Sequence, residues 1–410
     1  MAFANNKKLK LIAAMVGDEM AYIKGSKSYF SQGELKGKKY GMKLSGYLPD
    51  PGTSRDGIVA NPDAINEPEI NAYLNNKNNS CEVDLWNELT DVENFMEEIG
   101  APRAKNLALT TQKDIMKEAM FESAQAVVVT SVGFGLLTKS SKALGELGIA
   151  GKRLSFQSPN IMGEIAEAGL SRFIPSENMK KIYEDAYLGK YSGAEQIEIA
   201  NTPIIDTTDM DSAPTISADR VVDANNNILG LEPITAITLS NNAKVVEGMP
   251  YKLSGLKIRN AAGIETDQDY VIIAHTEKRG SSSVLIIPEL RIATPGTGYN
   301  NANAVISSAA ITAALSGDTA TFTLTPMLTA SKKYAIGQVR TDTCLGFDQY
   351  RFENLPGSEA EDVGTFGNVT LKLMAFGDGK NGVKLVRIDF PYAAKIYDHR
   401  ESVTTYTLVS

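Results

Sequence analysis

Side chains that commonly perform acid–base or nucleophilic chemistry are scarce in this chain. It has two histidines, His275 and His399, and two cysteines, Cys81 and Cys344. A histidine could activate a serine or Cys344 as a nucleophile, but the sequence lacks the G-x-S-x-G nucleophile elbow. We expect both histidines to be satisfied surface or strand-end residues, with His275 ending a strand and His399 in a turn. The sequence therefore predicts no enzyme.

Metal and cofactor motifs are equally weak. Asp206, Asp209 and Asp211 could hold calcium, but the glycine and the distant glutamate of a calcium loop are missing, so a polar linker is the alternative. Cysteine and histidine show no zinc spacing. The segment Gly133-Phe134-Gly135 is a fragment of a dinucleotide fingerprint without its third glycine. We expect no metal and no cofactor.

Composition indicates a globular protein of two or three domains. The chain has 410 residues, 43% of them hydrophobic and 22% charged. A net charge of −8 argues against a general nucleic-acid binder. Two cysteines so far apart make no disulfide framework. The apolar run after Lys10 is too short for a signal peptide, and Ala124–Leu137 is too short to span a membrane, so we expect a protein of cytoplasmic origin without membrane segments.

The N-terminal third combines a basic segment, a long loop and a long helix. Residues 1–43 hold nine lysines against three acidic residues, which predicts either a solvated arm or contact with an acidic partner. An amphipathic helix is expected over Leu9–Ile23. The glycine- and proline-rich stretch from Gly25 to Asn79 predicts a projecting loop, a β-hairpin that packs outside its own subunit. Apolar spacing predicts a helical rod over Pro102–Val128, with a possible break near Thr110 because Thr111 and Asp114 have capping-box spacing.

Two shorter helices are expected next, over Asn160–Gly169 and after Ser176. The stretch Ile204–Ser331 then changes to short alternating segments separated by turn formers, which predicts an all-β module inserted into an α+β chain. The expected strands of this module are 235–239, 251–258, 270–274 and 283–287. Beyond it, strands are predicted over Tyr334–Arg340, over the hairpin Val369–Phe376 and Val383–Phe390, and over Ser402–Val409.

Three stretches resemble the major coat protein of tailed, double-stranded DNA bacteriophages. They are Ile174-Pro175-Ser176-Glu177 through Asn201-Thr202-Pro203-Ile204, Ile237-Thr238-Leu239-Ser240 through Gly255-Leu256, and Phe376-Gly377-Asp378-Gly379 through Ile388-Asp389-Phe390. The order of predicted elements is also similar to that of this family. The match is to the short-tailed podovirus branch, whose coat protein carries an extra β domain.

This resemblance implies the tailed-phage capsid fold, with an N-arm, an extended loop, a peripheral domain with a spine helix, an axial domain and an inserted barrel-like β domain. The implied divisions are an arm at 1–25, the extended loop at 26–79, the peripheral domain and start of the axial domain at 80–203, the insert at 204–331, and the axial domain with a return to the peripheral domain at 332–410.

The resemblance also implies self-assembly into an icosahedral virion shell of hexamers and pentamers, built in the host cytoplasm. The implied partners are a scaffolding protein, a portal protein and a cement protein, with genomic DNA enclosed without sequence-specific binding. Asp18 and Glu19 fall where scaffold-binding acids would lie, or they form a solvated helical turn. Inter-subunit contact is expected from loop aromatics, namely Tyr29, Phe30, Tyr40 and Tyr47.

A second hypothesis makes the β module a glycan- or cell-surface-binding domain of a virion protein. Such a domain needs an exposed aromatic platform, for which the module offers Tyr251, Tyr270 and Tyr299.

Overall fold

A computed structural model of the chain divides into two compact units. It describes residues 13–17, 19–28, 40–47, 69–84, 100–149, 151–170, 190–210, 215–219, 234–239, 244–260, 264–276, 278–279, 284–290, 292–293, 304–306, 319–350, 360–366, 369–378 and 383–409. Unit 1 comprises Met1–Gly46, Ile70–Met116 and Leu345–Lys395, and unit 2 comprises Tyr47–Glu69, Lys117–Cys344 and Ile396–Ser410. Helices and mixed sheets in the same chain confirm the predicted α+β class. The five predicted domain divisions remain a prediction.

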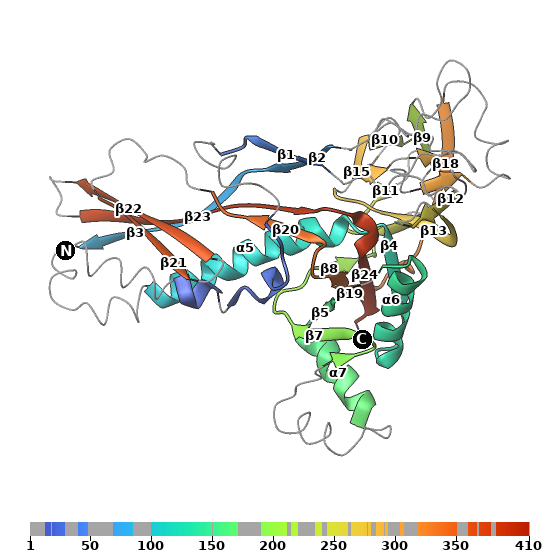
Figure 1. Cartoon of the computed structure of the whole chain (residues 1–410), viewed down its shortest axis with the longest axis horizontal. Coiled ribbons are helices and arrows are strands. Elements are labelled where there is room, and N and C mark those ends of the chain that lie inside the picture. The colour runs from blue at the N-terminus through green and yellow to red at the C-terminus, as the bar shows by residue number, and fades with distance from the viewer. Residues whose placement is uncertain are drawn as a thin grey trace, which may run out of the picture. The chain divides into compact units, whose positions relative to one another are not determined.

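Unit 1 is built on a long strand with a long helix beside it (Figure 1). Strand β23 (Val383–Ile396) pairs with β3 (Asn75–Asp84) along one edge and with β22 (Val369–Asp378) along the other. Strand β21 (Ala360–Phe366) extends the sheet beyond β22, and β20 (Leu345–Asp348) also pairs with β23. The 14 residues of β23 span about 46 Å. The predicted pair β22–β23 is confirmed, with Asp378 opposite Val383 next to the turn.

Polar contacts with the long helix α5 (Ala101–Phe121) hold β3 in place. The sequence of β3, NNKNNSCEVD, has no apolar alternation that could fix its register. Arg103 of α5 donates to Asn79 at 2.6 Å, and Asp114 of α5 pairs with Lys77. The strand state of β3 therefore comes from its partners and not from its own pattern.

Helix α5 differs from the sequence expectation at two points. It is continuous through Thr110, whose hydroxyl donates to the carbonyl of Asn106 at 2.7 Å within the helix instead of starting a new one, so the predicted break is wrong. The helix also ends at Phe121, and the predicted extension to Val128 is wrong because Gln125–Val129 forms strand β4. Three successive valines favour a strand there.

The described part of the N-terminal arm packs on its own subunit. Its helical turn and the 3-10 helix η1 (Ala21–Ile23) bury Val16, Met20 and Tyr22 completely. The amide of Tyr22 donates to the side-chain oxygen of Gln112 in α5 at 3.0 Å. The amide of Lys27 then donates to Leu345 of β20 at 2.9 Å. The described part of residues 13–28 thus contacts both α5 and β20 within unit 1, and we name this segment the clip. The predicted start of this helix at Leu9 lies outside the described residues.

Unit 2 centres on a seven-stranded mixed sheet. Its strand order is β4, β24 (Ser402–Leu408), β19 (Lys333–Thr341), β5 (Arg153–Gln157), β7 (Ala194–Glu198) and β6 (Lys190–Tyr191), and β8 (Ile204–Asp206) also pairs with β19. The strands predicted at 334–340 and 402–409 are confirmed as β19 and β24.

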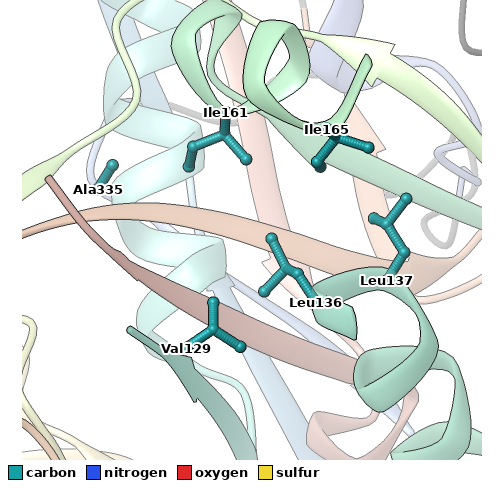
Figure 2. Close-up of a cluster of buried hydrophobic side chains, with 6 residues drawn as sticks. All are labelled: Val129, Leu136, Leu137, Ile161, Ile165 and Ala335. Atoms are coloured by element: carbon teal, nitrogen blue, oxygen red, sulfur yellow. The ribbon is translucent and has the colours of Figure 1, made fainter. Parts of the chain in front are cut away.

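Helices α6 (Phe134–Glu146) and α7 (Pro159–Leu170) pack against this sheet through an apolar cluster. Figure 2 shows the side chains of this cluster converging from the two helices and the two strands β4 and β19. The cluster consists of Val129, Leu136, Leu137, Ile161, Ile165 and Ala335. The predicted helix at 160–169 is confirmed as α7, whereas the helix predicted after Ser176 lies outside the described residues.

Polar side chains of the central strands cap the C-terminal end of α5. Gln338 of β19 donates to the carbonyl of Ala119 at 3.1 Å, and Thr404 of β24 donates to that of Met120 at 2.5 Å. The last four carbonyls of a helix have no partner within it, so buried donors must satisfy them. The buried glutamine, serine and threonine side chains of this sheet therefore have a structural role.

The β module forms a second sheet. Its order is β15 (Val284–Leu290), β10 (Ile234–Leu239), β9 (Thr215–Asp219), β18 (Thr319–Pro326), β12 (Pro250–Arg259), β17 (Ala304–Ile306) and β16 (Ile292–Ala293), with β13 (Glu265–Ile273) also on β12. The first and last strands of this order, β15 and β16, are one residue apart in the chain. Strands β11 (Lys244–Val245) and β14 (Lys278–Arg279) pair separately. All four strands predicted for the module are confirmed; its status as an insertion remains a prediction.

Among the described helices, none is long and apolar enough to cross a membrane.

Candidate inter-subunit surface

A two-stranded ribbon in the N-terminal third of the chain carries exposed aromatic side chains. It consists of β1 (Lys43–Tyr47) and β2 (Glu69–Tyr73), which pair only with each other among the described strands. The amide of Leu74 donates to Met42 at 3.0 Å, and Ser45 donates to the side chain of Asn71 at 3.2 Å. Higher residue numbers in β1 are bonded to lower residue numbers in β2, so the two strands are antiparallel. Antiparallel pairing is what the predicted β-hairpin requires. Here the extended loop of the prediction has regular structure.

One face of the ribbon is anchored in unit 1. Leu44, Ala72 and Leu74 are buried and cluster with Ala393 of β23 and with Tyr350, which follows β20. A two-stranded sheet alone is marginally stable in water, so this apolar contact is what keeps the ribbon folded.

Tyr350 is the polar element of this anchor. Its hydroxyl donates to the carbonyl of Asn75 at 3.1 Å, at the start of β3. Burial raises the pKa of Tyr350 to about 12, and the nearby Tyr40 and Asp389 add to the shift. The Tyr350 hydroxyl therefore stays protonated at neutral pH and remains a hydrogen-bond donor.

Tyr350→Phe is expected to loosen the ribbon without unfolding the chain. Losing this hydrogen bond leaves the Asn75 carbonyl short of a donor, which costs about 1 kcal/mol. Limited proteolysis should cut within residues 40–74 several-fold faster in the variant. Because Tyr406 also has a buried hydroxyl, 2.8 Å from the Gly248 carbonyl in unit 2, Tyr406→Phe is the matched control and should leave ribbon cleavage unchanged.

The ribbon and the residues directly before it carry exposed apolar side chains. Nine large hydrophobic side chains of the described residues are exposed, and four of them lie on or beside this ribbon. They are Tyr40 (70% exposed), Met42 (40%), Tyr47 (58%) and Tyr73 (57%), which we name the ribbon patch. Tyrosine and methionine are enriched in protein–protein interfaces, and grouped exposure of this kind marks an interaction site.

Some of the contact residues predicted from the sequence lie in the ribbon patch, and others lie outside the described residues. Tyr40 and Tyr47 lie in the ribbon patch, while Tyr29, Phe30 and Asp18 lie outside the described residues. The predicted scaffold contact Glu19 pairs with Lys105 of α5 at 3.4 Å. Sequence reasoning missed Met42 and Tyr73. The alternation Ile70-Asn71-Ala72-Tyr73-Leu74 was the available signal for Tyr73, since it predicts a strand with Tyr73 outward.

The potential nucleophile Cys344 and the potential base His399 are poorly suited to catalysis. Burial raises the pKa of the Cys344 thiol well above its usual value, so this thiol stays protonated. His399 lies in the 3-10 helix η3 (His399–Glu401) and is buried, so the predicted surface position is wrong. Its Nδ1 is 2.7 Å from the carbonyl of Glu122, which ties η3 to the end of α5. His275 packs edge-on against Phe121 at 6.2 Å between ring centroids, just beyond β13.

The aspartates considered for calcium are held by other side chains. Asp206 accepts hydrogen bonds from Thr208, which lower the pKa of this carboxyl, and Asp209 pairs with Lys244 at 3.3 Å. Asp211 lies outside the described residues. In the described part of the chain, no group of three or more histidine, cysteine or acidic residues is arranged to hold a metal.

The Gly133-Phe134-Gly135 fragment lies at the start of α6, beside a pocket of about 420 Å³. Thr130 and Ser131 on the rim of this pocket are exposed. Gly133 is the N-cap residue of α6.

Two of the three tyrosines considered for a glycan platform are buried in the described part of the β module. Tyr251 and Tyr270 are 0% and 1% exposed, and burial raises the pKa of Tyr251. Tyr299 lies outside the described residues. Aromatic exposure in the described part of the chain is therefore concentrated on the ribbon.

Neither a protein-family model nor a curated protein matches the sequence. Among solved structures, the chain is similar to the acidic stable capsid structure of Helicobacter pylori bacteriophage KHP30, at 8% identity and a TM-score of 0.47, covering 94% of this chain and 88% of that chain. It is also similar to the capsid of Ralstonia phage GP4, at 7% identity and a TM-score of 0.47, covering 95% and 88%. A third similar structure is the capsid structure of the cyanophage P-SCSP1u, at 7% identity and a TM-score of 0.45, covering 95% of this chain and 88% of that chain. Likeness at these identities and TM-scores assigns no function to this chain.

Proposed function

We propose that this chain is the major capsid protein of a tailed, double-stranded DNA bacteriophage, and that it self-assembles into the icosahedral shell of the virion. The observation that carries this proposal is the ribbon patch. Tyr40, Met42, Tyr47 and Tyr73 are exposed on or beside a ribbon that other apolar side chains anchor to unit 1. Such a limb has little use on an isolated subunit, because it leaves apolar surface in water.

The order of elements along the chain supports the same function. An N-terminal clip, the ribbon, the helix α5, the mixed sheet of unit 2, the sheet of the β module and the returning strands β22, β23 and β24 follow one another. This is the order that the sequence resemblance to tailed-phage coat proteins implies. A closed shell needs heterologous contacts repeated by rotation, and several separate limbs provide more edges than one compact surface.

The remaining partners follow from this role and are proposed with it. They are a scaffolding protein during assembly in the host cytoplasm, a portal protein, a cement protein and the enclosed genome. The pairing of Glu19 with Lys105 leaves Glu19 38% exposed at its side chain, so a basic scaffold segment can compete for it. The overall charge of −8 suits a container that does not grip DNA.

Replacing two ribbon-patch residues is expected to abolish assembly. Tyr47→Ser with Tyr73→Ser removes two aromatic anchors from each proposed contact, and losing about 2 kcal/mol per anchor weakens each contact roughly 1,000-fold. Sedimentation velocity and negative-stain microscopy should show large particles for the unaltered chain and subunits alone for the double variant.

Ile204→Ser with Ile264→Ser is the matched control, because both isoleucines are exposed, at 64% and 62%, and neither belongs to the ribbon. This control should form particles like the unaltered chain. Normal particles from the tyrosine variant would contradict the proposed role of the ribbon.

A further inference from the structure

The chain enters the β module from strand β8 and leaves it into strand β19. These two strands pair antiparallel, with Asp206 opposite Lys333 at the end of the pair. Beyond this end the two chain segments stay bonded to each other over residues 206–208 and 329–333, which we name the collar. The base of the module is therefore held by the contacts within the collar.

Thr207 bonds to the facing segment of the collar through its amide, its carbonyl and its side chain. The amide donates to the carbonyl of Lys332 at 2.9 Å, and the carbonyl accepts the amide of Ser331 at 3.0 Å. The hydroxyl lies 2.7 Å from the carbonyl of Thr329 and 2.9 Å from that of Lys332, so these two acceptors share its one hydrogen. It also accepts the Lys332 amide at 3.0 Å. One side chain thus joins backbone groups 122 to 125 residues later in the chain.

The Thr207 side chain is buried inside a joint whose other residues are exposed. Thr207 is 0% exposed, whereas its neighbours Asp206 and Thr208 are exposed, as are residues 329–333 of the facing segment. Its hydroxyl therefore points into the joint, where water cannot replace the hydrogen bonds that it makes. Hydrogen bonds, more than apolar packing, hold the collar closed.

The facing segment of the collar contains strained backbone. Ser331 has a φ of 58°, in the left-handed region that residues with a side chain adopt only at a cost in free energy. Its amide is the one that the Thr207 carbonyl accepts. The turn begins at Thr329, whose amide donates to the buried Tyr334 hydroxyl at 3.2 Å. Such a conformation persists only where surrounding contacts fix it, and the bonds from Thr207 are contacts of this kind.

We propose that Thr207 locks a strained collar and that this collar is the hinge of the β module. With the hydroxyl in place, the entry and exit segments form one joint, and the base of the module is fixed to β19. Without the hydroxyl, the turn 329–332 relaxes and the base opens, while the pairing of β19 with β24 and β5 remains. This inference does not depend on the proposed capsid function.

Hydrogen exchange of backbone amides in the full-length protein tests the lock. Thr207→Val keeps the shape of the side chain but removes the hydroxyl, so the Lys332 amide and the Thr329 carbonyl lose this partner. Exchange in peptides covering 204–210 and 328–333 should become faster by about tenfold or more, as expected when buried polar groups are left unbonded.

Two control variants and two reference regions show whether the effect belongs to the collar. Thr207→Ser keeps the hydroxyl and should stay within about twofold of the unaltered chain. Thr266→Val removes another threonine hydrogen bond of the module, 2.8 Å long, and should leave the collar unchanged. In Thr207→Val, exchange in 336–341 should not change. The same holds for Val271, whose amide joins the module to Ala124 at 3.1 Å.

The strain has its own test. Adding Ser331→Gly to Thr207→Val should recover part of the protection, because glycine adopts the left-handed conformation without strain. In the unaltered protein, the amides of Ser331 and Lys332 should exchange at least about 100-fold more slowly than in an unstructured peptide, although both residues are exposed. This last measurement decides the matter even if Thr207→Val does not fold. Unprotected amides there, unchanged exchange in Thr207→Val, equal acceleration in either control, or no recovery with Ser331→Gly would each overturn the proposal.

Discussion

Gly337→Ala is expected to cost about 3 kcal/mol or more of folding free energy, and the variant should accumulate as insoluble protein. Gly337 lies in the central strand β19 of unit 2, opposite Thr405. A methyl group at this position would lie 2.6 Å from Cδ of Gln157 and 2.7 Å from Oγ1 of Thr405, and closer still to the Gln157 oxygen. Both side chains are completely buried, so neither can move into open space.

The cost has two parts. Forcing a methyl group into a filled core costs about 1–3 kcal/mol. Displacing the Gln157 amide breaks its 3.2 Å hydrogen bond to Thr405, and an orphaned buried amide costs about 1–3 kcal/mol more. Soluble yield and urea denaturation followed by circular dichroism measure the effect.

Two variants separate this clash from a general effect of adding a methyl group. A Cβ at Gly163 in helix α7 meets nothing within 4 Å, so Gly163→Ala should leave stability unchanged or raise it slightly. Adding Gln157→Ala to Gly337→Ala makes room for the methyl group and should recover part of the loss. A Gly337→Ala protein as stable as the unaltered chain would contradict the packing of this sheet.

Asp389→Ala is expected to destabilise unit 1 by about 2 kcal/mol, because the Asn76 amide loses its acceptor and the part-exposed Arg387 loses its ion pair. The Asp389 carboxylate is 0% exposed and accepts Arg387 in a bidentate pair at 2.8–3.0 Å. It also accepts the Asn76 amide of β3 at 2.6 Å. Since β3 lacks apolar alternation, we expect its pairing with β23 to fail first.

Hydrogen exchange over residues 75–84 and equilibrium unfolding measure this effect. Asp114→Ala is the matched control, since it removes an exposed partner of the same strand, Lys77, and exposed pairs contribute less than about 1 kcal/mol. Equal losses in the two variants would show that the buried carboxylate has no special role in holding β3.

Much of the secondary structure was predictable because it follows local patterns. Apolar spacing of three and four predicted α5 and α7, and alternation with turn residues predicted β22, β23 and the strands of the β module. The end of α5 was misplaced because its apolar spacing continues across the turn at Glu122–Ala124 into the valines of β4. Gln338 and Thr404, from distant strands, cap the end of α5, and local sequence does not show these contacts.

Other features depend on distant partners and could not be read from local sequence. Strand β3 resembles a polar loop, and its pairing with β23 makes it a strand. His399 has the sequence surroundings of a surface turn but is buried, because Asp398 and Arg400 fold η3 against the β12–β13 hairpin. Tyrosines at 47 and 251 have similar alternating neighbours, and only the fold exposes the first and buries the second.

The two N-terminal limbs have different physical characters. The clip of residues 13–28 buries its apolar side chains on its own subunit, with Val16, Met20 and Tyr22 at 0% exposure. The ribbon buries one face and leaves Tyr40, Tyr47 and Tyr73 in water. Self-assembly is therefore attributed to the ribbon, and the clip is assigned to the stability of unit 1.

The most direct test of the account is a side-chain-resolution electron microscopy map of the particles that the full-length chain forms. The account predicts a closed shell in which the ribbon patch of each subunit is buried against a neighbouring copy. A chain that stays a lone subunit at every concentration, or a shell whose ribbon tyrosines all face solvent, would contradict it.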